Sequence, residues 1–158
     1  MDSESVKLTL MTDEMYRTFF QEYENDPDLF LPGQVYKPFE YSEEKVERYI
    51  QRQRDLKRIT LAILFNHEIV GEIIIKDIKA KTSAVMGIAL KNSRYKDHGI
   101  GTLAEKLVIR YVFDELDIPT LYADSIKSNL RSRHVLEKAG FNFIREDKDF
   151  MYYRIDRE

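Results

Sequence analysis

The strongest structural signal in this sequence is Lys96-Asp97-His98-Gly99-Ile100-Gly101-Thr102-Leu103-Ala104. It follows an apolar segment with the composition of a strand and begins the clearest amphipathic pattern of the chain. From Ile100 to Val112, apolar side chains recur every three or four residues, which predicts a helix. Glycines let the backbone approach a ligand, and the first N–H groups of a helix are free to bind an anion. The stretch therefore predicts either a phosphate-binding loop or a helix N-terminus where the glycines only allow the backbone to turn and no ligand binds.

The same glycines allow another interpretation. Gly99, Gly101 and Ala104 match the fingerprint of dinucleotide-binding βαβ units, and Asp124 lies about 20 residues further on. That alternative implies a small NAD-binding oxidoreductase. In such units the glycine loop turns directly off its strand, whereas residues 91–98 separate the predicted strand from Gly99 here. The loop also follows several predicted strands with no crossover helix between them, so we disfavour this alternative.

A second motif follows a predicted strand at Thr120–Ile126. It reads Asn129-Leu130-Arg131-Ser132-Arg133-His134-Val135-Leu136-Glu137-Lys138-Ala139-Gly140-Phe141. Together with K-x-x-G-x-G at 96–101, it resembles the two conserved motifs of the GCN5-related N-acetyltransferase (GNAT) superfamily, in the family's order and spacing. The pattern N-x-x-S-x-x-V-L-E-K-x-G-F resembles the ribosomal-protein N-terminal and polyamine acetyltransferase branches in particular. The resemblance covers residues 82–141, and the flanking elements extend it to nearly the whole chain.

Hydrophobic periodicity predicts the remaining elements. We expect strands at Val6–Leu10, Ile59–Phe65, Ile69–Ile78, Thr82–Leu90, Thr120–Ile126, Phe141–Arg145 and Phe150–Ile155. We also expect helices capped by Thr12 or Asp13 and by Ser42, and a helix over Asn129–Ala139 that Gly140 ends. Residues 1–158 thus predict one α/β (α+β) domain, and the resemblance implies the GNAT fold. In that fold a mixed, mostly antiparallel sheet of six to seven strands is flanked by about four helices.

Composition excludes several function classes. The 158 residues carry 25 basic and 28 acidic side chains, a net charge of −3, so we expect no nucleic-acid partner. Cysteine is absent, which removes disulfides, thiolate metal sites and thiol nucleophiles. His67, His98 and His134 lie far apart in the sequence and predict no metal site. We read no signal peptide and no membrane span, and we expect a cytoplasmic globular domain; a homodimer is left open.

The resemblance implies acetyl-CoA as co-substrate, an amine as acceptor and no metal. Backbone amides of the glycine loop would hold the pyrophosphate, and the exposed edge of the preceding strand would pair with the pantetheine arm. The resemblance assigns to the cofactor Ile88, Ala89, Leu90, Arg94, Lys96, Asp97, His98, Gly99, Ile100, Gly101, Thr102, Asn129 and Ser132. Asn129 is equally explained as the helix N-cap, and both roles are compatible.

The implied reaction is direct attack by a neutral amine on the thioester. Many family members protonate the departing thiolate with a tyrosine, but the matching position here is Leu136. Ser132 is the candidate near the sulfur; alternatively, its hydroxyl bonds only to the preceding helical turn. Without the tyrosine, a second function class stays open, a catalytically degenerate acyl-CoA-binding protein.

The general base is not decided by the sequence. Some relatives carry a glutamate where this chain has Val85, and the nearest strand carboxylates are Glu72 and Asp124. Glu72 alternates with Ile74 and Lys76, which favours an exposed strand face over a catalytic role. A water chain with no dedicated side-chain base is a further alternative.

The family also implies a wall for the acceptor site. The proline-rich segment Asp26–Tyr41 would supply it, and Tyr36, Phe39 and Tyr41 predict a partly apolar cleft. The alternative explanation is that these rings belong to the core.

Overall fold

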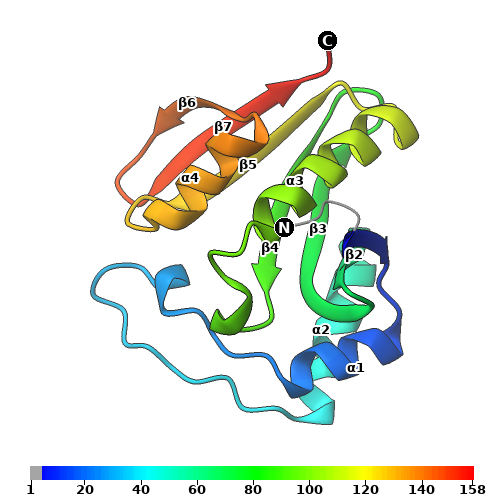
Figure 1. Cartoon of the computed structure of the whole chain (residues 1–158), viewed down its shortest axis with the longest axis vertical. Helices are drawn as coiled ribbons and strands as arrows, with labels where there is room; N and C mark the ends of the chain where they lie inside the picture. Colours follow the sequence, from blue (N-terminus) through cyan, green and yellow to red (C-terminus); the bar gives the residue numbers. More distant parts are fainter. Residues whose placement is uncertain (1–4) are drawn as a thin grey trace.

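The computed structural model describes residues 5–158 and contains a seven-stranded sheet in the order β1-β2-β3-β4-β5-β7-β6 (Figure 1). The strands are β1 (Val6–Leu10), β2 (Ile59–Phe65), β3 (Glu68–Lys79), β4 (Ser83–Leu90), β5 (Thr120–Ile126), β6 (Asn142–Glu146) and β7 (Phe150–Asp156). In this described sheet β4 and β5 run parallel, and the other five neighbouring pairs are antiparallel. The mixed sheet confirms the predicted fold class. It does not match the doubly wound parallel sheet that the NAD-binding alternative requires.

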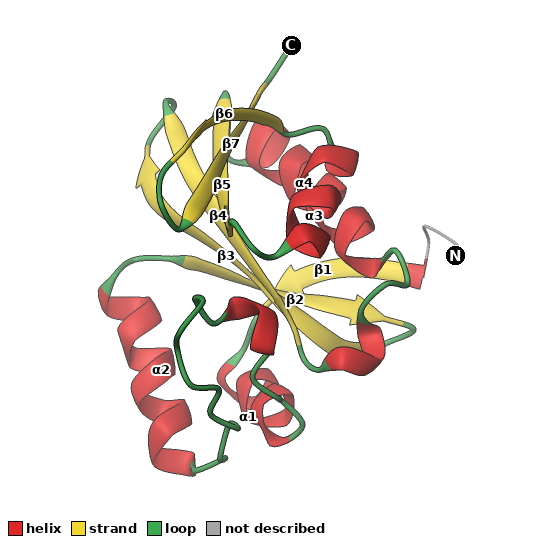
Figure 2. Ribbon diagram, turned by 90° about the vertical axis from the view of Figure 1, so that its left-hand side faces the viewer, coloured by secondary structure: helices red, strands yellow, loops and turns green. Residues whose placement is uncertain are grey.

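Two pairs of helices cover opposite faces of the sheet (Figure 2). One face carries α1 (Asp13–Gln21) and α2 (Glu43–Asp55), and the other carries α3 (Ile100–Arg110) and α4 (Leu130–Ala139). Short helical turns lie at η2 (Pro27–Leu29) and η3 (Ser93–Tyr95), and the π-helical η4 (Tyr111–Glu115) continues α3. The helices among residues 5–158 are each too short or too polar to cross a membrane.

The predicted caps account for the helix boundaries. The hydroxyls of Thr12 and Ser42 each accept a hydrogen bond of 3.1 Å from a backbone N–H three residues later, so α1 and α2 begin there. Gly140 has φ +113° and ends α4 in the left-handed region, as predicted.

The hydrophobic core has two parts, one on each face of the sheet. The larger part lies under α3 and α4 and includes Ile73, Val108 and Leu121, all completely buried. The smaller part is aromatic and joins α1 and α2 to the sheet through Tyr16, Phe19, Phe20, Val46 and Ile50. Burying a side chain of this size contributes about 1.5–3 kcal/mol, so both helix pairs are firmly docked on the sheet.

The parallel strands β4 and β5 separate along their length. Their ladder ends at the pair Met86 and Ala123. Beyond it, β4 stays paired with β3 as far as Leu90, and β5 stays paired with β7 as far as Ile126. Residues 87–90 therefore present one strand edge that no strand of the described sheet covers. Gly87 is regularly paired rather than bulged, and the β3–β4 irregularity lies between Lys76 and Lys79.

Candidate active site

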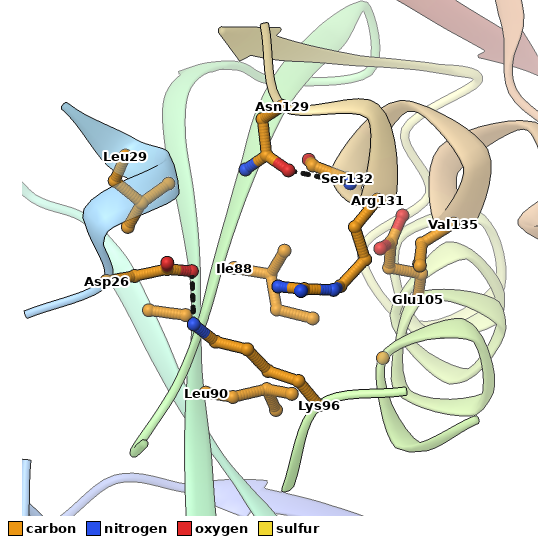
Figure 3. A pocket seen from close by; sticks show the side chains of 12 residues that line it. Asp26, Leu29, Ile88, Leu90, Lys96, Glu105, Asn129, Arg131, Ser132 and Val135 are labelled. Carbon is orange, nitrogen blue, oxygen red and sulfur yellow. Dashed lines mark hydrogen bonds and ion pairs between the residues drawn. The ribbon is translucent and has the colours of Figure 1, made fainter. Parts of the chain in front are cut away.

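The divergence of β4 and β5 opens a cleft (Figure 3). The free edge of β4 lies along it, α3 and α4 form one wall, and the segment around η2 forms the other. The lining residues are Asp26, Leu29, Ile88, Ala89, Leu90, Lys96, Gly101, Glu105, Asn129, Arg131, Ser132 and Val135. A strand edge and a helix N-terminus therefore meet in one cleft.

The backbone at the start of α3 leaves room for a ligand to approach it closely. Gly99 is its N-cap with φ +78°, a conformation that favours glycine, and no side chain caps the helix there. Gly101 lines the cleft, and a Cβ on it would meet only Val135 Cγ1, at 3.5 Å. The first N–H groups of α3 thus lie beside an open space where an anion can bind.

The cations of the cleft are already paired with carboxylates. Lys96 Nζ lies 2.8 Å from Asp26 Oδ2, and both side chains are mostly buried. Arg131 contacts Asp97 at 2.9 Å and Asp28 at 3.1 Å. These pairs join the η2 segment, the glycine loop and α4 across the cleft. The prediction that Lys96 adds local positive charge therefore needs correction, because Asp26 neutralises it.

The residues from 88 to 102 that were predicted to bind the cofactor divide into those that line the cleft and those that do not. Ile88, Ala89, Leu90, Lys96 and Gly101 line the cleft as expected. Asp97 holds Arg131, and Arg94 lies over the Tyr95 ring at 5.9 Å from its centroid. The side chain of Ile100 is buried in the core, and His98, Gly99, Ile100 and Thr102 are not among the lining residues of the described cleft.

Asn129 and Ser132 lie together at the start of α4. Asn129 Oδ1 accepts a hydrogen bond of 3.1 Å from the Ser132 backbone N–H, which confirms the predicted N-cap. Both residues also line the cleft, so the cap and a cofactor contact are geometrically compatible.

The cleft continues past Ser132 into a second cavity of about 220 Å³. The two cavities share Leu29, Ile88, Asn129 and Ser132, which therefore mark their junction. The second cavity adds apolar walls from Met86, Leu136 and Phe150 and polar groups from Lys76, Asp124 and Ser125. Leu136 thus lines this cavity without a donor, whereas Asp124 brings a carboxylate.

The expectation of an exposed Glu72 is wrong. Glu72 is 5% exposed and accepts a hydrogen bond of 2.6 Å from the Tyr49 hydroxyl. Burial raises its pKa, opposed in part by the hydroxyls of Tyr16 and Tyr49. The alternation on β3 is real, but α1 and α2 cover this face of the strand. The structure does not bring Glu72 into the lining of the cleft with Ser132 and Asp124.

The aromatic rings of the segment 26–41 also divide. Phe39 and Tyr41 pack against the α1–α2 core, as the core explanation predicts. Tyr36 is 42% exposed and donates a hydrogen bond of 2.8 Å to Asn25 O. The residues of this segment that reach the cleft are Asp26 and Leu29.

Sequence reasoning missed Glu105 and Arg131. Glu105 lines the cleft and is 2% exposed, and burial raises its pKa to about 8. Its spacing of four residues from Gly101 was a usable signal, because such residues share one helix face. Groups of three or more metal-binding side chains are not found within residues 5–158.

A family profile and several solved structures match this chain. The profile of the acetyltransferase (GNAT) domain family matches residues 6–142. A search of curated protein sequences finds no significant match. Among solved structures, Campylobacter jejuni N-acetyltransferase PseH aligns with a TM-score of 0.72 and 19% identity, covering 98% of this chain and 99% of that one.

Two ligand complexes are also similar. PseH in complex with acetyl coenzyme A aligns with a TM-score of 0.64 and 26% identity, over 73% of this chain and 79% of that chain. The aminoglycoside acetyltransferase AAC(6')-Ib, in complex with ribostamycin and coenzyme A, aligns with a TM-score of 0.80 and 17% identity. That alignment covers 97% of this chain and 94% of the other. The divergent strands, the glycine-started helix and a family profile over most of the sequence lead to one conclusion: this chain is an acyltransferase of the acetyltransferase (GNAT) domain family.

Proposed function

We propose that this acetyltransferase moves the acetyl group of acetyl-CoA to a primary amine, either a protein N-terminus or a small-molecule amine. The observation that carries the proposal is the free edge of β4 at 88–90, which lies in one cleft with the start of α3. An arm rich in amides pairs with a strand edge, and a pyrophosphate binds at a helix N-terminus. The similar structures of PseH and AAC(6')-Ib with acetyl coenzyme A or coenzyme A support this donor.

The donor and acceptor would occupy the two halves of the cleft. In the first half, Gly99 and Gly101 would admit the pyrophosphate to the backbone N–H groups of α3. The junction at Asn129 and Ser132 would then hold the thioester end. The second cavity would take the amine, where Asp124 offers a carboxylate for its ammonium form.

The reaction would be a direct transfer. The neutral amine nitrogen attacks the thioester carbonyl carbon, the C–S bond breaks, and the nitrogen loses a proton. An alkyl amine has a pKa of about 10.4, so a proton must leave the bound ammonium before attack. Asp124 or a water chain would accept it, and the Ser132 hydroxyl would donate a hydrogen bond to the departing thiolate.

Two observations bear on the class of amine that would accept the acetyl group. The N-x-x-S-x-x-V-L-E-K-x-G-F motif favours a protein N-terminus or a polyamine, while AAC(6')-Ib is an aminoglycoside acetyltransferase. Each choice would place an ammonium near Asp124 and apolar groups against Met86 and Phe150. The predicted membership of the ribosomal-protein or polyamine branch stays a prediction.

An acceptor panel tests the proposal. Acetyl-CoA is mixed with a polyamine, a peptide with a free α-amino group or an aminoglycoside, and released thiol is measured with a thiol reagent. The chain has no cysteine, so the reagent detects only released CoA. Amine-dependent release supports the proposal. Acetyl-CoA binding without release on any amine would favour the acyl-CoA-binding alternative, and absence of binding would overturn the proposed donor.

A further inference from the structure

Glu105 is a buried acid in the wall of the cleft. It lies on α3, four residues after Gly101, and therefore on the same helix face. The side chain is 2% exposed, and its Oε1 has no hydrogen-bond partner among the described residues. Figure 3 shows the carboxyl group beside Val135, where α3 and α4 meet behind the cleft. A polar atom buried without a partner is costly, so its presence in a cleft points to a partner that arrives with a ligand.

The charged groups around Glu105 are engaged elsewhere. From α4, Arg131 pairs with Asp28 and Asp97, and Arg133 donates to Lys127 O at 3.1 Å. From the glycine loop, Lys96 pairs with Asp26 of the η2 segment. On the opposite side of α3, Lys7 of β1 lies in a different groove, with Leu107. The facing residues of β4, Ile88 and Leu90, are apolar.

This environment determines the protonation state of the Glu105 carboxyl when no ligand is bound. With no cation paired to it, the carboxyl is influenced by burial, which raises the pKa of Glu105 to about 8. At pH 7 the group is therefore mainly a neutral acid with one proton to donate.

We propose that Glu105 is a cofactor-binding residue that works as a neutral acid, donating a hydrogen bond to a carbonyl or hydroxyl oxygen of the amide arm of acetyl-CoA. The inference rests on the proposed donor. Gly101, in the first turn of α3 where the phosphates would bind, lies about 6 Å along the helix axis from Glu105, at 1.5 Å per residue. An ionised carboxylate at this distance repels the phosphates and cannot donate, so binding selects the protonated form. Acetyl-CoA binding should therefore take up a proton near pH 8.

Calorimetry with acetyl-CoA tests the proposal, because the thioester has no thiol to titrate in this range. Wild-type affinity should weaken about tenfold from pH 7 to pH 9, as the protonated fraction falls. At pH 8, binding measured in two buffers of different ionisation enthalpy should show uptake of about half a proton per acetyl-CoA. The second ionisation of the cofactor phosphate lies near pH 6, outside this window.

Three variants separate donation from neutrality and from general pH effects. Glu105→Gln keeps a donor and cannot ionise, so it should bind as tightly as wild type at pH 7 and lose the weakening at pH 9. Glu105→Leu should bind about three- to tenfold more weakly at pH 7, because the donor is gone. Glu137→Gln, on the exposed side of α4, should keep the wild-type pH dependence and serves as the control.

The results distinguish a failure of the role proposed for Glu105 from a failure of the proposed donor. Wild-type affinity that is unchanged between pH 7 and pH 9, with no proton uptake, would overturn the role of Glu105, as would a Glu105→Leu variant that binds as tightly as wild type. Circular dichroism on each variant confirms that the fold is retained. Failure of wild type and all variants to bind acetyl-CoA would instead overturn the proposed donor.

Discussion

Tyr49 donates a hydrogen bond of 2.6 Å to Glu72 Oε1, inside the aromatic cluster that joins α1 and α2 to the sheet. Glu72 Oε2 has no partner in the described part of the chain. Burial raises the pKa of both groups, because each loses the hydration that would stabilise its charged form. Because Glu72 does not line the cleft, the pair is explained as a structural contact rather than as a catalytic base.

This explanation predicts how stability depends on pH. The folded-state pKa of Glu72 is above its unfolded value of 4.5, so the folded state binds more protons. Its contribution is fully present below pH 4.5 and is lost as pH rises towards the folded-state pKa. Glu72→Gln should therefore gain stability relative to wild type as pH rises above 4.5, measured by urea denaturation at a series of pH values.

Kinetics and a partner variant complete this test. Glu72→Gln should keep kcat within twofold of wild type at pH 7, whereas Tyr49→Phe should destabilise the fold by about 1–3 kcal/mol by removing the donor. A kcat loss above tenfold in Glu72→Gln, with unchanged stability, would return Glu72 to the role of general base.

Gly101→Val should abolish acetyl-CoA binding. A side chain at this position projects beside Val135 into the space next to the start of α3, where the pyrophosphate would lie. The fold should stay cooperative, because valine in a helix costs less than about 1 kcal/mol relative to alanine. Lys106→Val, on the exposed side of α3, is the matched control and should bind normally. Equal affinity of Gly101→Val by calorimetry would place the phosphates elsewhere.

Local sequence signals predicted most of the fold. The apolar run Ile59–Phe65 and the helical period after Ile100 are short-range signals, so the bounds of the predicted elements agree with the structure within a few residues. The exposed edge of the strand before the glycine loop was implied by resemblance, and the β4–β5 ladder, which ends at Met86, leaves that edge uncovered in the described sheet.

The parts that could not be predicted depend on long-range packing. Glu72 has the pattern of an exposed face, but helices distant in sequence bury it. Arg131 pairs with Asp28, which is 103 residues away, and no local pattern specifies such a partner. Glu105 was hidden because a helical period shows which face a residue occupies but not what lies against that face.

Ser132→Ala should lower kcat about ten- to hundredfold with little change in acetyl-CoA affinity. A hydrogen bond to a developing charge is worth about 1.5–3 kcal/mol, and Leu136, which also lines the second cavity, has no donor to replace it. Steady-state kinetics with an amine from the acceptor panel measures the effect. Ser128→Ala, at an exposed serine that does not line the cleft, is the control. A rate within twofold of wild type would remove Ser132 from the mechanism.

Asp124→Asn should raise KM for the amine and leave the Kd of acetyl-CoA unchanged. The carboxylate lines the second cavity but not the first, so its loss removes an ammonium partner only on the acceptor side. We expect about a tenfold rise in KM, the effect of losing one hydrogen bond to a charged group. Asp114→Asn on η4 should leave KM unchanged. A weaker affinity for acetyl-CoA in Asp124→Asn would contradict this division of the cleft.

Asp26→Asn should tighten acetyl-CoA binding. Asp26 Oδ2 lies 2.8 Å from Lys96 Nζ, with 17% and 12% of the two side chains exposed. A phosphate that binds near the glycine loop must compete with this carboxylate for Lys96 and is also repelled by it. Asparagine removes the charge but keeps an oxygen that can accept from the Asp28 N–H, so the start of η2 is preserved.

Without acetyl-CoA, the Asp26→Asn variant should be less stable than wild type, because Lys96 has lost its buried partner and no phosphate replaces it. Adding acetyl-CoA should then raise the Tm of Asp26→Asn more than that of wild type, since the stabilisation by a ligand grows with the logarithm of its affinity for the folded state. Calorimetry should show several-fold tighter binding that weakens as salt is raised, because the new contact is between full charges. Glu24→Gln, an acid outside the cleft lining, is the control and should match wild type. Affinity that is unchanged or weaker in Asp26→Asn would show that Lys96 serves to hold the η2 segment against the loop and takes no part in binding the phosphates.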